Sequence, residues 1–237
     1  MRKIHELKNI ISQKSNILII YNPEKGLDAT SAGLAFFNFL NKFRNVNVIP
    51  KKIPPQLKEF VKTPKAICDE YYSIEIKAKN IESIFYEKDD TLKIYLVANN
   101  GQIKDDDIVV KEVVEKCERC DLFIAIGFEK KDDYLKTLKE YNLPEDTRET
   151  VCINNNENCE NFGKINISAK SGFSLCELLT FILKHIDEAG FDKDVGEILI
   201  FGIKSFWDGK KLPNKTLEII NYLTQINQKW NSKTLKQ

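Results

Sequence analysis

The sequence has almost no excess of charge of either sign, because its 237 residues include 36 Lys and Arg and 35 Asp and Glu. With a formal net charge of +1 at pH 7, no strong overall field draws the protein onto nucleic acid or an acidic membrane. Histidine is scarce as well, with only His5 and His185 present. Hydrophobic residues still make up 42% of the chain, which is enough for a sizeable core.

Long hydrophobic runs are also missing. The longest, FIAIGF (123–128) and ILIFGI (198–203), are far shorter than the ~20 residues that cross a bilayer. Residues 1–16 begin with charge but contain no unbroken apolar stretch of the kind that a secretory signal needs. We therefore expect no membrane association and a cytoplasmic location.

A complete cysteine set for a zinc site is missing. Cys117 and Cys120 have a metal-type or redox-type spacing, but Cys152 and Cys159 are too far apart to supply the second pair of a zinc knuckle. A redox pair begins a helix, whereas this one precedes a predicted strand. Because no export signal accompanies the six cysteines, we expect free thiols in a reducing compartment.

What is present is an alternation of strands and helices. NILIIY (16–21) is apolar on both faces and predicts a buried strand, followed by a turn over 22–28, a helix over 29–43 and a second strand over 45–50. This is a βαβ unit, which is nearly always right-handed. The same reasoning predicts helices over 2–13, 107–116, 131–143, 174–190 and 216–230, strands over 121–128 and 150–154, and either type over 197–206.

Between residues 71 and 98 the pattern changes. YYSIEIKA (71–78), IESIFYEK (81–88) and LKIYLVA (92–98) alternate apolar and polar residues, which is typical of half-exposed strands. We interpret them as an antiparallel β-meander inserted into a mainly parallel sheet flanked by helices. The predicted fold class is α/β, in a single domain over residues 1–237.

Four segments, in this order, resemble the DHH family of phosphoesterases, which includes oligoribonucleases and exopolyphosphatases. NILIIYNPEKGLDATSAGLAF (16–36) is similar to the family's strand followed by H-x-N-P-D-G-D-A-x-G-S. CDLFIAIGFEKKDDY (120–134) is similar to a strand that ends in an aspartate. VCINNNENCENFGKINISAKSGFSLCELL (151–179) is similar to I-D-H-H-x-x-N-x-x-F-G-x-x-N followed by Ser-x-x-Glu. ILIFGIKSFWDG (198–209) is similar to L-x-x-G-I-x-x-D-T-G.

The resemblance implies a two-metal phosphoesterase site at the carboxyl ends of the parallel strands, where open α/β sheets bind their ligands. Two Mn²⁺ or Mg²⁺ ions in such a site bridge an attacking hydroxide and hold the phosphoryl oxygens. The family also has a smaller substrate-binding domain after the fourth segment, and its glycine- and histidine-rich signature is absent here. We therefore expect this chain to correspond to the catalytic-domain half of the family's proteins, with a frayed tail over residues 231–237.

Most of the metal-ligand positions carry other residues. The first-motif histidine falls at Ile20 or Tyr21, and the first aspartate falls at Glu24 or Lys25. Only the second aspartate is kept, as Asp28.

The later motifs have changed in the same way. The second-motif aspartate falls at Gly127, the D-H-H triplet has become Asn154, Asn155 and Asn156, and the fourth-motif aspartate falls at Phe206, with Asp208 two residues later. Asparagine offers a neutral oxygen where such ions prefer carboxylate or imidazole. Because losing even an outer-shell partner costs ~10–100-fold in affinity or activity, we expect a vestigial cleft without a metal cofactor. Four further residues are expected to shape it: Asn22, Ser31, Ser174 and Glu177.

Simpler structural explanations exist for the same residues. Asp28 suits the N-cap of the helix that follows it as well as a remaining metal ligand, and we favour the cap. The three asparagines carry amides that suit a nucleotide edge or a phosphate, but asparagine is also common in turns that end strands. Ser174 and Glu177 have the Ser-x-x-Glu spacing of a capping box.

The leading hypothesis is a DHH-like pseudo-phosphoesterase that acts as a binding, regulatory or assembly protein for an unknown protein partner. One alternative is a weak or altered metal-dependent phosphoesterase for short oligonucleotides or nucleotides, with one ion bound by Glu24, Asp28 or Asp208. Another is a non-catalytic nucleotide-binding module. The aromatic residues of the meander suit base stacking, a half-buried sheet or pairing with a partner's strand, and we do not expect nucleic acid as the main partner.

Overall fold

The computed structural model describes residues 1–62, 71–76, 81–99, 107–113, 120–141, 143, 149–170 and 172–234. The chain divides into two compact units. Unit 1 comprises Met1–Cys68 and Cys117–Gln237, and unit 2 is the intervening segment Asp69–Lys116.

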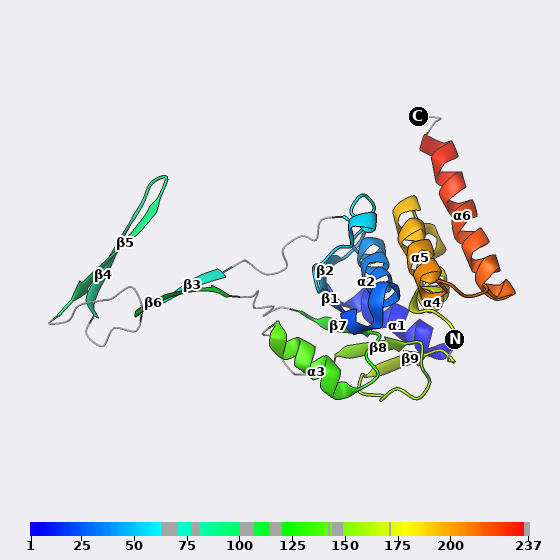
Figure 1. Ribbon diagram of the computed structural model, residues 1–237, viewed down its shortest axis with the longest axis horizontal. Helices are drawn as coiled ribbons and strands as arrows, with labels where there is room; N and C mark the ends of the chain where they lie inside the picture. The colour runs from blue at the N-terminus through cyan, green and yellow to red at the C-terminus, as the bar shows by residue number, and fades with distance from the viewer. Residues whose placement is uncertain are drawn as a thin grey trace. The chain divides into compact units, whose positions relative to one another are not determined.

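Unit 1 is built on a five-stranded, fully parallel sheet in the order β2-β1-β7-β8-β9 (Figure 1). The strands are β1 (Asn16–Tyr21), β2 (Asn45–Ile49), β7 (Leu122–Ile126), β8 (Thr150–Asn154) and β9 (Ile165–Ser168). The central strands β1, β7 and β8 carry consecutive buried residues, because helices lie on both faces of a parallel sheet.

Helices cover the sheet on its two faces. Ile17 and Ile19 belong to the larger core, shared with α1, α2, α4, α5 and α6, whereas Leu18 and Ile20 belong to a second core under α3. The helices are α1 (Arg2–Gln13), α2 (Gly26–Leu40), α3 (Lys131–Glu140), α4 (Leu175–Asp187), α5 (Lys193–Phe206) and α6 (Asn214–Thr234), with short 3-10 turns at η1 (Pro23–Lys25), η2 (Pro55–Leu57) and η4 (Glu188–Gly190).

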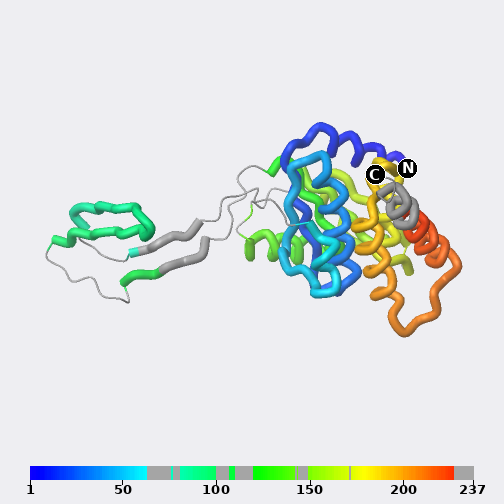
Figure 2. The backbone as a smooth tube through the Cα atoms, turned by 90° about the horizontal axis from the view of Figure 1, so that it is seen from above, coloured from blue at the N-terminus to red at the C-terminus, as the bar shows by residue number. Residues whose placement is uncertain are grey.

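Helices α2 and α5 lie side by side, next to α4 (Figure 1, Figure 2). They are tightly packed at Gly202 of α5, where an added Cβ would lie 2.3 Å from the Sγ of Cys176 and 2.7 Å from the Cβ of Ser31. Any larger residue at this position would push the three helices apart, since interiors are close-packed. Ser31 therefore contributes to helix packing.

The ambiguous segment 197–206 is helical and belongs to α5. Its buried residues Ile198, Leu199 and Ile203 follow the helical spacing, and the Oδ1 of Asp192 accepts a hydrogen bond of 2.9 Å from the backbone N–H of Val195. A short apolar run does not by itself distinguish a strand from a helix; here the cap and the spacing of the buried residues decide.

Unit 2 contains two separate antiparallel strand pairs. β4 (Ile81–Lys88) pairs with β5 (Leu92–Ala98), and β3 (Tyr71–Ile76) pairs with β6 (Ile108–Val113). The predicted antiparallel insertion is present, but β3 pairs with β6 and not with the neighbouring β4. The predicted helix over 107–116 is wrong, because the β-branched residues of IVVKEV form strand β6.

The predicted fold class, an α/β protein with a mainly parallel sheet flanked by helices, is confirmed. At the C-terminal end, α6 continues to Thr234, past the expected helix end at Trp230, and residues 235–237 lie outside the described part. No helix in the described ranges is long and apolar enough to cross a membrane.

Candidate functional site

A cleft of about 440 Å³ lies at the carboxyl edge of the parallel sheet. It is lined by Lys25 and Asp28 after β1, Glu129 after β7, and Asn155 and Asn156 after β8, together with residues of α4 and α5 and the loops beside them. Parallel strands bring their following loops to one edge, which is where open α/β sheets bind ligands. The predicted cleft residues Asp28, Asn155, Asn156 and Phe206 all line it.

Asp28 is buried, and its carboxylate is fully engaged by the start of α4. Its Oδ2 accepts a hydrogen bond of 2.7 Å from the backbone N–H of Leu175, and its Oδ1 accepts one of 3.0 Å from that of Cys176. The predicted N-cap role in its own helix is wrong, because Lys25 occupies the N-cap of α2. Asp28 instead stabilises the N-terminus of α4, where a negative charge is favourable.

The protonation of Asp28 reflects this environment. Burial raises the pKa of Asp28 above its ordinary value, and the hydrogen bonds from Leu175 and Cys176 oppose that increase. The nearby Glu177 carboxylate raises the pKa further. Backbone N–H groups of α4 occupy both carboxyl oxygens of Asp28, and a metal ion would have to replace those hydrogen bonds.

Ser174 and Glu177 form the predicted capping box at the start of α4. The Oγ of Ser174 accepts a 2.9 Å hydrogen bond from the N–H of Glu177, and the N–H of Ser174 donates one of 2.6 Å to Glu177 Oε2. The Glu177 carboxylate also accepts from Thr216 Oγ1 at 2.6 Å and from Trp207 Nε1 at 3.3 Å. Glu177 thus joins α4 to α6 and to the end of α5.

Two of the three asparagines connect loops through their amides. Asn154 is buried and donates a 2.7 Å hydrogen bond from Nδ2 to the carbonyl of Phe128, while Asn155 donates one of 2.8 Å to the carbonyl of Phe173. The Oδ1 of Asn154 has no hydrogen-bond partner among the described residues. Asn154 does not line the cleft, whereas Asn155 and Asn156 do, together with Asn158.

An ion pair between Lys25 and Glu129 lies at the cleft, joining the loops after β1 and β7. The hydrogen bond from Lys25 holds the pKa of Glu129 below its ordinary value, and a hydrogen bond from the Asn156 side chain acts in the same direction. The Oδ1 of Asn156 accepts a 3.0 Å hydrogen bond from the N–H of Asn158. Sequence reasoning missed Glu129, although it directly follows a buried strand in the second motif.

Gly127 occupies the second-motif aspartate position with a backbone that suits glycine. Its φ is +79°, in the left-handed region, and an added Cβ would lie 3.1 Å from Leu175 Cδ1. Asn22 supports the same loop, since its Nδ2 donates a 3.4 Å hydrogen bond to the Gly127 carbonyl and its Oδ1 accepts one of 3.0 Å from the Glu24 N–H. An aspartate at position 127 would require Leu175 to shift, in a backbone conformation that favours glycine.

The remaining candidate residues lie outside the cleft. Tyr21 is buried, and its hydroxyl donates a 3.2 Å hydrogen bond to the carbonyl of Lys52. Ser31 is buried at the α2–α5 contact, and its Oγ has no hydrogen-bond partner within the described ranges. Glu24 and Asp208 are exposed and do not line the cleft.

The two buried free thiols lack the features of reactive cysteines. Cys152 and Cys176 are buried, and burial raises the pKa of Cys152 to about 12 and that of Cys176 well above its ordinary value. Reactive thiols need the opposite shift. Cys117, the first member of the predicted pair with Cys120, lies outside the described residues.

The donor set of the cleft does not fit a pair of divalent metal ions. Within the described ranges, no three His, Cys, Asp or Glu side chains are grouped so that they could hold a metal. The two cleft carboxylates are engaged, that of Asp28 by backbone N–H groups and that of Glu129 by Lys25. Manganese-like ions need several free anionic or imidazole ligands.

The fold and the cleft together define an α/β protein with a cleft at the carboxyl edge of a parallel sheet. A crystal structure of an exopolyphosphatase-related protein from Bacteroides fragilis has this fold, with a TM-score of 0.58 at 14% sequence identity. The match covers 94% of this chain and 56% of that one. This agrees, at the level of the fold, with the resemblance of the four segments.

No family model matches the sequence, and a search of curated proteins gives no match either. The likeness in structure therefore concerns the fold alone.

Proposed function

We propose that this chain is a DHH-like pseudo-phosphoesterase, which keeps the phosphoesterase fold without two-metal hydrolysis and acts as a binding, regulatory or assembly protein. One observation carries the proposal: both carboxylate oxygens of Asp28, the one metal-ligand aspartate kept in the motifs, accept hydrogen bonds from the backbone of α4. A residue that stabilises a helix start in this way is part of the scaffold.

The loops around Asp28 support the same conclusion. Gly127 has a positive φ and a close neighbour in Leu175, so the missing aspartate would need Leu175 to shift. Lys25 forms an ion pair with Glu129, so the second carboxylate of the cleft is already neutralised by a lysine. Binding two divalent metal ions here would require breaking the Asp28 hydrogen bonds to α4 and the Lys25–Glu129 ion pair. The side-chain amides of Asn155 and Asn156, which also line the cleft, carry no charge to offset that of the ions.

A non-catalytic nucleotide-binding role is the second candidate, because the cleft itself persists. Its volume of about 440 Å³ lies within the usual range of small-molecule sites. Lys25, Asn155 and Asn156 line it, and they supply an ammonium group and two amides, which suit phosphate and base edges. The altered phosphoesterase gains no comparable support, since Glu24 and Asp208 are exposed away from the cleft.

The deciding experiment measures hydrolysis and binding in the same samples. Purified full-length chain is incubated with Mn²⁺ or Mg²⁺ and with pApA or a short RNA. We expect no turnover above the protein-free control. A rise in melting temperature with pApA, without turnover, would support the nucleotide-binding candidate, because a ligand that binds only the native state stabilises it.

Matched variants separate true turnover from contamination. Asp28→Asn changes the cleft acid, and Asp208→Asn changes an exposed acid of the same type. Metal-dependent turnover that Asp28→Asn abolishes and Asp208→Asn leaves intact, with both variants folded by circular dichroism, would show that the proposal of inactivity is wrong.

A further inference from the structure

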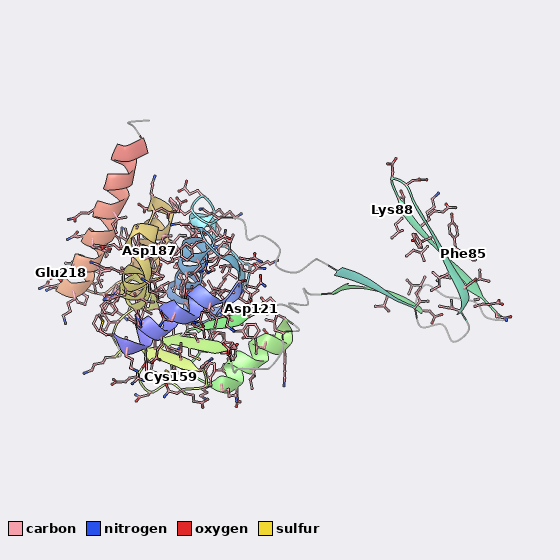
Figure 3. The ribbon with its side chains drawn as sticks, turned by 180° about the vertical axis from the view of Figure 1, so that it is seen from behind. Phe85, Lys88, Asp121, Cys159, Asp187 and Glu218 are labelled. Carbon is pink, nitrogen blue, oxygen red and sulfur yellow. The ribbon has the colours of Figure 1, made fainter. Side chains whose placement is uncertain are left out.

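The β4–β5 hairpin of unit 2 carries large apolar side chains that are not covered. No described residue of either strand is buried. Figure 3 shows the side chains of the hairpin, with Phe85 and Lys88 labelled, projecting from the ribbon. A two-stranded hairpin is at best marginally stable in water, because it needs a third strand or a packed face.

The register assigns these side chains to two different faces. Directly opposite residues share a face, and Ile84 lies opposite Leu96, as Tyr86 does opposite Ile94. We call this side the apolar face; its residues are Ile84, Tyr86, Leu92, Ile94 and Leu96. Its exposed fractions are 62% for Ile84, 74% for Tyr86, 57% for Leu92 and 41% for Ile94.

The opposite face is mixed in character. It places Phe85 opposite Tyr95 and Glu87 opposite Lys93. The hydroxyl of Tyr95 donates a 3.3 Å hydrogen bond to Glu87 Oε2, and the two charges lie next to each other. This face therefore combines polar groups with its aromatic rings. On the side of the apolar face the one charged residue in the paired register is Lys88, which lies opposite Leu92.

The size of the apolar face matches that of an interaction surface. Its exposed side chains amount to about 500 Å², at the upper end of the largest patch on an ordinary monomer. A partner that covers this face would bury about 500 Å² on each of the two proteins, about 1,000 Å² in total, which is near the minimum for a specific protein–protein interface.

The charge of the surrounding segment indicates which partner fits. Residues 69–116 contain twelve acidic and seven basic residues, a net charge of −5. Such a segment repels phosphate backbones, anionic membranes and a second copy of itself. It attracts a protein surface of the opposite sign.

We propose that the apolar face of the β4–β5 hairpin is the docking surface for a protein partner with a complementary apolar patch rimmed by Lys and Arg. The inference rests on the proposed binding role and identifies where that binding takes place. It involves none of the residues that line the cleft.

Ile84 and Phe85 provide a matched pair for the test, because they are adjacent, 62% and 59% exposed, and on opposite faces. The photoreactive residue p-benzoylphenylalanine is placed at either position in the full-length chain, which is irradiated in a lysate of the cells that make it. The cross-linked protein is identified, purified and titrated against the wild-type chain, Ile84→Ser and Phe85→Ser.

We expect a cross-link from position 84 to a protein with a basic surface, and a much weaker one from position 85. Ile84→Ser should weaken binding of that purified protein by about tenfold or more, and Phe85→Ser by less than about threefold. Added salt should weaken it further. The cross-linking result stands even where Ile84→Ser loosens the hairpin.

Several results would overturn the docking surface: cross-links between two copies of the chain, cross-links to nucleic acid, equal yields from both positions, or no cross-link from position 84. These outcomes are separate from the hydrolysis assay. Metal-dependent turnover together with a cross-link from position 84 and not 85 would overturn the proposed lack of hydrolysis and leave the docking surface standing. No turnover and no cross-link would overturn the docking surface alone.

Discussion

Asp28 and Leu175 are 147 positions apart in the sequence, and a 2.7 Å hydrogen bond from the Leu175 N–H to the Asp28 carboxylate joins them. Asp28 lies in the first turn of α2 and Leu175 begins α4. One carboxylate therefore lies at the positive ends of two helices at once, which stabilises both. The acid that resembles a metal ligand in the sequence performs an electrostatic task that needs no metal.

The first prediction concerns this carboxylate. Asp28→Asn replaces one acceptor oxygen by an NH₂ group that faces a backbone N–H, so we expect the free energy of unfolding to fall by about 2–3 kcal/mol. Urea unfolding followed by circular dichroism measures the change. Asp208→Asn, at an exposed position, should change it by less than about 0.5 kcal/mol. Equal effects of the two substitutions would show that Asp28 is not structural.

The second prediction concerns the position of the missing aspartate. Gly127→Ala combines a positive φ with a contact to Leu175, so we expect it to destabilise the fold by more than the ~1–2 kcal/mol that the backbone conformation costs. Gly209→Ala is the control, because Gly209 has a φ of +68° and no atom within 4 Å of an added Cβ. If Gly127→Ala costs no more than Gly209→Ala, Leu175 does not restrict this site.

The parallel sheet could be predicted from sequence because its signals are local. Strand β1 is apolar at successive positions, and α1 shows helical spacing at Ile4, Leu7 and Ile11. The pairing of β3 with β6 could not be predicted, since it joins residues on either side of the β4–β5 hairpin. The alternation of apolar and polar residues in a strand predicts which side chains share a face, but it does not predict which other strand pairs with it.

The candidate site shows the same limit. Of the residues that the four motifs indicated, Asp28, Asn155, Asn156 and Phe206 line the cleft, whereas Gly127, Asn154 and Asp208 do not. They did not reveal that Asp28 caps a distant helix, because its donors are backbone N–H groups, which carry no sequence signal. The ion pair of Lys25 with Glu129 was missed for a related reason: each residue is unremarkable in its own loop, and only the sheet brings the two loops together.

A third prediction tests the connection between α4 and α6. Thr216→Val removes the hydroxyl that donates to the buried Glu177 carboxylate at 2.6 Å, and we expect a loss of about 1–3 kcal/mol, because a buried acceptor loses its partner. Thr224→Val in the same helix removes only a hydrogen bond to the backbone carbonyl of Ile220, one turn earlier, and should have little effect. Equal losses would place the cause in helix propensity, not in Glu177. Thermal unfolding of the two variants gives the comparison.

The last prediction concerns the ion pair at the cleft. Because the hydrogen bond from Lys25 lowers the pKa of Glu129 below its ordinary 4.5, Lys25→Met should raise that pKa towards the ordinary value. Carboxyl ¹³C NMR titration of Glu129 measures it. Lys130→Met is the control, since Lys130 acts on Glu129 only as a weaker, unbonded charge, and it should shift the pKa less.

The sign of the accompanying pH dependence follows from the lowered pKa of Glu129. A carboxyl group whose pKa is lower in the folded state contributes stability that is present above its ordinary pKa and is lost as the pH falls through the folded value. The difference in unfolding free energy between the wild-type chain and Lys25→Met should therefore shrink below pH 4.5. A constant difference across that range, or an unchanged Glu129 pKa in Lys25→Met, would mean that the ion pair does not persist in solution and that the cleft has a free carboxylate.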